Sequence, residues 1–149
     1  MTKPSPTIVI DTREQAPWCF TLPTVRATVP SGADYTILGF EAELGIERKS
    51  LDDLIGSLTQ GRDRFERSLA ALRLRPFRAL VIEGSLSDVA RGRYLSNALP
   101  TSIVGSLASI MADGVPVVFA DEPGAAAAFA ERLLLKFHKR AMAAQKRAA

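Results

Sequence analysis

The sequence has little of several features that would assign it to a special class of protein. It contains one cysteine, Cys19, so an internal disulfide is excluded and a reducing compartment is expected. No apolar run approaches the ~20 residues that a membrane-spanning helix needs. The first residues, MTKPSPT, lack the apolar stretch of an export signal. These absences together predict a cytoplasmic protein without a membrane partner.

Other classes are excluded by what is missing around single residues. No serine stands in an arrangement with histidine that would support acyl transfer, and the one histidine, His138, is expected on the surface of a basic segment. Neither repeats nor an interdomain linker is visible. A chain of 149 residues suits one domain, which can bury roughly two thirds of its unfolded surface. We expect a single domain over residues 1–149 with flexible ends, about 1–6 and 141–149.

The charges are unevenly distributed, although the formal net charge is only +3. Residues 1–60 hold five basic and eight acidic residues, whereas 61–78 hold six arginines and two acids. From Arg132 to the end there are six bases and no acid. Phosphates attract Lys and Arg while a divalent metal needs carboxylates, so this pattern fits a metal-dependent enzyme acting on a polyanion. Solvated helix faces and a basic tail would give the same pattern, so charge alone leaves both interpretations open.

The hydrophobic pattern predicts a mixed α/β order. In the first half we expect an antiparallel meander of strands at 7–10, 24–29, within 31–39 and at 40–47. In the last of these, alternation would put Glu41, Glu43 and Gly45 on one face. Ser50 is a good N-cap for a helix, and a second helical stripe then runs to Pro76. In the second half we expect strands at 79–83 and 116–120 that alternate with helices at 101–114 and 124–145. This alternation implies that part of the sheet is parallel.

The segment IERKSLDDLIGSL, residues 46–58, begins with three charged residues at the end of an apolar strand. Because residues i and i+2 of a strand point to the same face, Glu47 and Lys49 can meet one ligand while Arg48 points away. A carboxylate that holds Mg²⁺ and a lysine that orients water or stabilises negative charge suit phosphodiester hydrolysis. A Glu-x-Lys pair by itself, however, is more often an exposed ion pair.

Magnesium needs further oxygen ligands, and three other acids of the first half are candidates. Asp34 belongs to the turn before a short strand, while Asp11 and Glu14 follow the first strand. All three could be neighbours of Glu47 in a meander.

Several longer strings together resemble the nuclease domain of the XPF-type endonucleases, which cut flaps and junctions. The strings are IDTRE, the ADY turn, IERKSLDDLIGSL and the helix start GRDRFE. The family pattern of Gly-Asp, a spacer, Glu-Arg-Lys, three residues and Asp is matched by Asp34, Glu47-Arg48-Lys49 and Asp53. The resemblance extends through VIEG at 81–84 and the two later helices. It implies an α/β fold of the restriction-endonuclease-like PD-(D/E)xK type, with a mixed central sheet flanked by helices.

The resemblance also implies a catalytic set and a cofactor. The divalent metal would be Mg²⁺, with Mn²⁺ as a substitute, and Lys49 would be the catalytic lysine. The catalytic residues would be Asp34, Glu47, Lys49, Asp11 and Arg48, and the metal ligands Asp34, Glu47, Asp11 and Glu14.

Further charged residues would support the site or bind DNA. Arg13 and Arg48 would form ion pairs or phosphate contacts, and Asp53 would orient Arg48 or Lys49. Asp53 also stands three residues after Ser50, so it could simply belong to a helix cap. Two arginines, Arg62 and Arg64, would contact DNA or brace the pocket, although Arg62 could equally be a solvated helix residue.

The chain departs from the family pattern in two ways. The glycine does not directly precede the aspartate, since the order is Gly32-Ala33-Asp34. The sequence ends soon after the last nuclease-domain helix, without a helix-hairpin-helix module, so we expect it to resemble the small stand-alone members found in bacteria and phages. Two apolar stripes within 101–138 predict a homodimer, although both could instead cover the sheet of their own subunit. One consists of Ile103, Leu107, Ile110 and Met111, and the other of Phe129, Leu133 and Phe137 beside Leu134.

The function implied is a metal-dependent endonuclease acting on branched, flapped, forked or nicked DNA in repair or recombination. The alternative is a non-catalytic DNA-binding or dimer-partner module of the same fold. In such members the acidic and lysine positions tend to be lost, whereas all of them stand here. A restriction-type nuclease with sequence specificity ranks third, because no recognition domain is evident.

Overall fold

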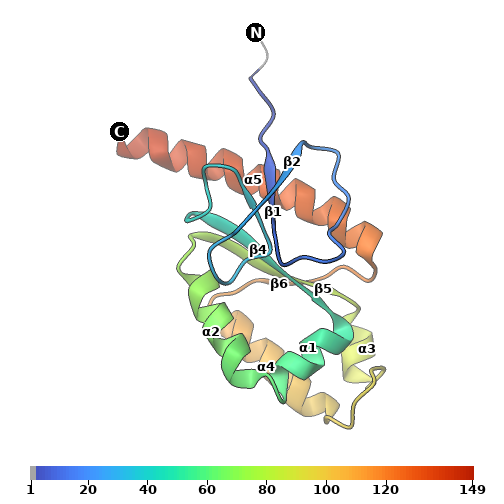
Figure 1. Cartoon of the computed structure of the whole chain (residues 1–149). Coiled ribbons are helices and arrows are strands. Elements are labelled where there is room, and N and C mark those ends of the chain that lie inside the picture. The colour runs from blue at the N-terminus through green and yellow to red at the C-terminus, as the bar shows by residue number, and fades with distance from the viewer. Residues whose placement is uncertain (1–2) are drawn as a thin grey trace.

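The computed structural model describes residues 3–149, and a six-stranded mixed sheet forms its centre (Figure 1). The start of the expected flexible end, residues 1–2, lies outside this described part. The strand order is β2-β1-β3-β4-β5-β6. The bounds are β1 (Ile8–Asp11), β2 (Thr24–Ala27), β3 (Tyr35–Ile37), β4 (Leu44–Ser50), β5 (Phe77–Glu83) and β6 (Val117–Phe119).

Helices cover both faces of the sheet, which gives three layers. One face carries α1 (Leu51–Leu58), α2 (Arg62–Arg73) and α4 (Pro100–Ala112), with the short α3 (Leu86–Ala90) beside α4. The long α5 (Pro123–Ala148) packs on the other face, mainly across β4 and β5. Among the described residues, no helix is both long and apolar enough to cross a membrane.

Strand alternation divides the core into two clusters. On β4, the buried Leu44 and Ile46 belong to the cluster under α5, whereas Leu80 and Ile82 of β5 belong to the cluster under α1, α2 and α4. The odd-numbered residues of β4 therefore face the side of α1 and α2. Glu47 and Lys49 are on that side, and Arg48 is on the side of α5.

Several predicted elements are confirmed. The parallel part of the sheet is formed by β4, β5 and β6. Ser50 is the N-cap of α1, because its Oγ accepts a hydrogen bond from the backbone N–H of Asp53 at 3.2 Å.

The stretch expected to be flexible, 141–149, is helical as far as Ala148, and Ala141 is buried.

The predicted antiparallel meander is wrong in two places. β2 lies at the outer edge and pairs in parallel with β1, so β3 is the neighbour that joins β1 to β4. Residues 40–43 form a turn instead of the first half of a strand. Gly39 adopts a φ of +88°, and the N–H groups of Glu43 and Leu44 both donate to the carbonyl of Phe40. These local hydrogen bonds override the alternation, and Glu41 and Glu43 do not share a strand face with Gly45.

Candidate active site

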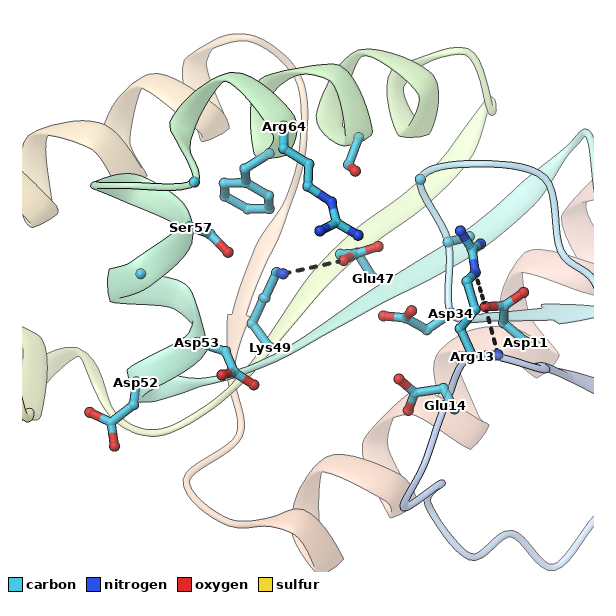
Figure 2. Close-up of a pocket in the computed structure, with 16 residues that line it drawn as sticks. Asp11, Arg13, Glu14, Asp34, Glu47, Lys49, Asp52, Asp53, Ser57 and Arg64 are labelled. Atoms are coloured by element: carbon cyan, nitrogen blue, oxygen red, sulfur yellow. Dashed lines mark hydrogen bonds and ion pairs between the residues drawn. The ribbon is translucent and has the colours of Figure 1, made fainter.

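A cleft of about 510 Å³ opens between the end of β1, the turn before β3, the second half of β4 and helices α1 and α2 (Figure 2). Eight residues predicted for the catalytic site or its support line it: Asp11, Arg13, Glu14, Asp34, Glu47, Lys49, Asp53 and Arg64. The structure thus brings together acids from three separate segments of the chain.

Glu47 and Lys49 are neighbours on one face of β4. The Lys49 Nζ lies 3.8 Å from the Glu47 Oε1 and 5.1 Å from the ring centre of Phe65. Phe65 belongs to α2 and is buried. The ammonium is thus held between a carboxylate and an aromatic face, which fixes its position beside the open cleft.

Asp34 is held between two strands. Its N–H donates to the Ile46 carbonyl at 2.8 Å, and its own carbonyl accepts from the Asp11 N–H at 2.9 Å. One carboxylate oxygen, Oδ2, accepts a hydrogen bond from the backbone N–H of Arg48 at 2.8 Å. The backbone on both sides of Glu47 therefore orients this second acid.

Gly32 explains the spacing in the Gly-Ala-Asp turn. Its φ is +93°, and a Cβ at this position would lie 2.6 Å from the backbone N of Leu72 and the carbonyl O of Ser68. The turn packs directly against α2, so the position that requires glycine is two residues before Asp34. The departure from the family pattern thus leaves Asp34 in the cleft.

The two central acids repel each other. Burial raises the pKa of Asp34 to about 6, against the lowering effect of the Arg48 N–H. Burial and the charge of Asp34 raise the pKa of Glu47 to about 8, although the Lys49 ammonium lowers it. Burial, which disfavours the charged form of a carboxyl group, is the main cause of both shifts.

Asp11 lines the cleft but has both carboxylate oxygens occupied. Oδ1 accepts from the Val29 N–H at 2.9 Å, and Oδ2 accepts from the Arg13 Nε at 2.6 Å. Burial raises the pKa of Asp11, but the hydrogen bonds of Arg13 and Val29 outweigh it and hold the pKa below its usual value. This acid is charged and anchors the loop around Val29 and the exposed Arg13.

Arg48 lies behind the cleft, on the opposite face of β4. It forms ion pairs with Glu83 at the end of β5 and, at 3.2 Å, with Glu14. Its guanidinium also lies 4.9 Å from the ring centre of Trp18. Arg48 was predicted as catalytic, and its contacts join two strands to the loop carrying Glu14 on the face of β4 away from the cleft.

Tyr35 and Glu83 belong to the same network and were not among the predicted site residues. The Tyr35 hydroxyl donates to Glu14 Oε2 at 2.8 Å and accepts from the backbone N–H of Trp18 at 3.0 Å. Glu83 reaches Arg48 only because β5 pairs in parallel with β4, with Ser50 opposite Glu83. Local sequence contains no signal for such a partner 35 residues away.

The remaining predicted residues have separate positions. Asp53 lies at the cleft rim, and among residues 3–149 its carboxylate forms no ion pair with Arg48 or Lys49. Arg62 donates to the Leu58 carbonyl at 3.3 Å and the Ser106 Oγ at 3.4 Å, so it braces α1 against α4 outside the cleft. Arg64 extends from α2 toward Glu47 (Figure 2).

The donor set fits a hard divalent cation held by few protein ligands. Within residues 3–149, no three acidic, histidine or cysteine side chains lie close enough to enclose a metal by themselves. Mg²⁺ commonly keeps several waters and is bound through one or two carboxylates plus substrate phosphates. Asp34 and Glu47 are such a pair, and a cation between them would offset the cost of burying two carboxylates, which is the main cause of both raised pKa values.

Comparison with known proteins identifies the family. The ERCC4 domain matches residues 7–133, which is most of the chain. The chain belongs to the ERCC4 domain family. This membership confirms the predicted resemblance to XPF-type nucleases.

The fold of this ERCC4 domain is also found in a solved structure. It is similar to XPF from Aeropyrum pernix, with a TM-score of 0.68 and 20% sequence identity. The match covers 87% of this chain and 60% of the XPF chain. It confirms the predicted restriction-endonuclease-like fold, a mixed sheet flanked by helices. No protein of curated function matches the sequence.

Proposed function

We propose that this ERCC4 domain is a divalent-metal-dependent endonuclease that hydrolyses DNA phosphodiester bonds. Its substrate is DNA with a branch, flap, fork or nick, on which it acts inside the cell during repair or recombination. The observation that carries this proposal is the group at the cleft centre, where Glu47, Lys49 and Asp34 are oriented by the strand backbone. Two of these are buried acids with raised pKa values, and the third is a lysine held beside Glu47.

In this proposal Asp34 and Glu47 hold Mg²⁺, or Mn²⁺ in its place. When bound, the cation supplies Lewis-acid polarisation of the scissile phosphate and lowers the pKa of a bound water. Asp11 and Glu14 add negative charge at the rim of the same cleft. Asp11 contributes mainly by position, because both of its oxygens already accept hydrogen bonds.

Lys49 is the residue that we expect to touch the reacting phosphate. Its ammonium orients the attacking water or stabilises the negative charge that develops during displacement. Arg64 extends toward Glu47 from α2, and the exposed Arg13 lies beside Asp11, so both are placed to bind phosphates next to the scissile one (Figure 2). Asp53, at the rim near Lys49, would limit how closely DNA approaches that side.

The alternative is a non-catalytic DNA-binding or dimer-partner module. It would keep the fold without needing the cleft acids or the lysine. Here Asp34, Glu47 and Lys49 all stand and converge, and burying unneutralised carboxylates is unfavourable for folding. Their retention at that cost favours an active enzyme.

A homodimer through residues 101–138 is the second part of the proposal. Most of the apolar stripes predicted for it cover the chain's own sheet, since Ile103, Leu107 and Ile110 are buried there. Two side chains of these stripes remain exposed, Met111 by 54% and Phe129 by 47%. The dimer surface is therefore smaller than the sequence alone suggested.

The proposal is tested by cleavage of labelled flap, fork, four-way-junction and plain duplex DNA with Mg²⁺, Mn²⁺ or EDTA. We expect cleavage only with metal, and a loss of ~10²–10³-fold in rate for Lys49→Ala, because a fixed charge next to the reacting group is removed. Asp34→Asn should abolish cleavage while keeping the fold. Thr59→Ser, at the exposed C-cap of α1 and outside the cleft lining, is a surface control that should cut at the wild-type rate.

The outcomes separate the two functions. If no substrate is cut with either metal but branched DNA still binds, the chain is the partner module and not a nuclease. If Lys49→Ala cuts as fast as the wild type, the catalytic assignment of the β4 pair is wrong.

A further inference from the structure

The second half of α5 carries an unbalanced positive surface on the side of the sheet opposite the cleft. Six bases lie between Arg132 and the end of the chain, with no acid among them. Among residues 3–149, none of these bases forms an ion pair with a carboxylate. A surface helix normally intersperses charges of both signs, so this surface requires an explanation.

The acids that α5 does have are used within the fold. Glu122 caps the helix, and its carboxylate accepts from the N–H groups of Gly124 and Ala125. Glu131 is buried and accepts from the N–H groups of Thr21 and Leu22. Neither acid can neutralise the outer surface, which is therefore positive along its length.

A groove of about 730 Å³ runs along this positive surface. One wall is α5 and the other is the N-terminal segment at residues 3–6, which passes beside the helix (Figure 1). Cations line it, namely Lys3, Arg132, Lys136, Lys139 and Lys146. Its lining also includes apolar groups, which we call the apolar floor, namely Pro4, Pro6, Leu135 and Met142.

The spacing of the cations suits a linear polyanion. Arg132, Lys136, Lys139 and Lys146 follow steps of four, three and seven residues, which place them along one side of a helix. At ~1.5 Å per residue they span roughly 21 Å, the length of about six nucleotides at ~3.4 Å each. No carboxylate lines the groove as far as residues 3–149 are concerned.

We infer that this groove binds a single strand of nucleic acid, with phosphates on the cations and bases against the apolar floor. Single-strand sites combine such a charged track with apolar or stacking contacts to the bases, whereas a duplex hides its bases from a floor of this kind. The inference rests on the proposed function, because it assigns the unpaired arm of a flap or fork to a site remote from the cutting cleft.

The test uses the full chain carrying Asp34→Asn in EDTA, so that binding is measured without cleavage. Fluorescence anisotropy compares a labelled 12-nucleotide oligothymidylate with a duplex of the same length between about 50 and 200 mM salt. We expect the single strand to bind more tightly. In Lys136→Glu/Lys139→Glu its affinity should fall about tenfold or more, and the slope of log K against log salt should shrink by roughly 1.4.

Arg73→Glu/Arg91→Glu is the matched control, since it reverses two cations outside both the groove and the cleft. It should change the single-strand affinity by less than about threefold. Both lysines are exposed, so melting curves should be the same for the two double variants. Met142→Asp, which puts an anion on the floor, should weaken the single strand without removing any cation.

Several results would overturn the inference. These are equal losses in the control, equal or tighter binding of the duplex, and displacement of the oligonucleotide by polyglutamate or anionic lipid vesicles at equal charge concentration. Cleavage of nicked duplex by Lys136→Glu/Lys139→Glu, with Asp34 intact, separates this failure from failure of the proposed function. Normal cleavage with unchanged single-strand binding rejects the groove alone, and groove binding without any cleavage rejects only the nuclease.

Discussion

Glu47 lies on a central strand, yet its nearest charged neighbours on the cleft side include another acid. Its side chain is only 12% exposed, and Lys49 is 3.8 Å away, farther than a hydrogen bond. The lysine therefore compensates the burial of two carboxylates only in part. This residue makes the unliganded fold sensitive to pH and to cations.

The pH dependence has a definite sign. The folded pKa values of Glu47 and Asp34, about 8 and about 6, lie above the usual values of 4.5 and 3.8. The folded protein thus holds protons that the unfolded chain has released, and the stability from these groups is lost as pH rises from about 4 to 8. In EDTA, the midpoint of thermal unfolding should fall between pH 5.5 and 8.5, and Mg²⁺ should raise it more at pH 8.5.

Glu47→Gln removes the larger of the two shifts. Its unfolding midpoint should fall less over the same pH range, and Mg²⁺ should raise it less. Glu66→Gln, an exposed acid on α2, is the control and should keep the wild-type slope. A wild-type midpoint that rises from pH 5.5 to 8.5 in EDTA would contradict the assignment.

At the level of single residues, the sequence predicted the cleft members better than their supports. The i, i+2 rule placed Glu47 and Lys49 together and Arg48 apart. The partners of Arg48 were beyond its reach, because Glu83 becomes a neighbour only through the register of β4 with β5. The contact of Phe65 with Lys49 likewise depends on how α2 docks on the sheet.

At the scale of elements, β4 and the C-terminal end of α2 meet in a tight contact. Arg75, which is only 3% exposed, donates to the carbonyls of Glu41 at 2.9 Å, Ser31 at 3.0 Å and Pro30 at 2.8 Å. Its side chain passes over Gly45, where a Cβ would meet the Arg75 Cδ at 2.8 Å and the Ala33 Cβ at 2.7 Å. The absence of a side chain at Gly45 lets this arginine hold the turn that carries Asp34.

Gly45→Ala should therefore destabilise the protein by about 1–3 kcal/mol, the usual range for overpacking a filled site. Gly105→Ala is the matched control, because the new Cβ would have no neighbour within 4 Å on the exposed side of α4. It should stabilise the protein by about 0.5–1 kcal/mol through helix propensity. Urea unfolding measures both, and a neutral Gly45→Ala would show that the contact with Arg75 is not tight.

Elements were predictable where local signals agreed and not where they competed. The helix after Ser50 had a cap, acids in its first turn and an apolar stripe, and it forms as α1. Residues 40–43 alternate like a strand, but the positive φ of Gly39 and the hydrogen bonds to the Phe40 carbonyl hold them in a turn. The position of β2 outside β1 was not predictable either. The loop that joins the two strands has no regular structure, so the sequence gives no signal that β2 returns parallel to β1.

At the scale of the whole molecule, the proposed dimer is limited by charge as well as by burial. A two-fold contact through the second half of α5 would bring like charges face to face, which is unfavourable. The first half is different, because Phe129 there is 47% exposed and no base precedes Arg132 on this helix. A dimer through the part of 101–138 that precedes Arg132 would thus leave the basic groove open, whereas residues within 132–138 line that groove.

Sedimentation velocity over a range of protein concentrations should show the dimer in the wild type. Phe129→Glu should weaken association by about tenfold or more, since a charge enters the apolar contact. Leu74→Glu is the control, because Leu74 is 82% exposed and lies outside 101–138. A wild type that remains monomeric at all concentrations would remove the dimer from the proposal.

The alternation of β4 has one more consequence. Chemistry is assigned to its odd positions and architecture to its even ones, so mutation can remove the first without disturbing the second. During evolution, a domain of this kind can lose its activity by substitution while every intermediate variant still folds. For the same reason, a Lys49 variant should act as a substrate trap, a folded decoy that captures DNA in cells and marks where the intact enzyme works.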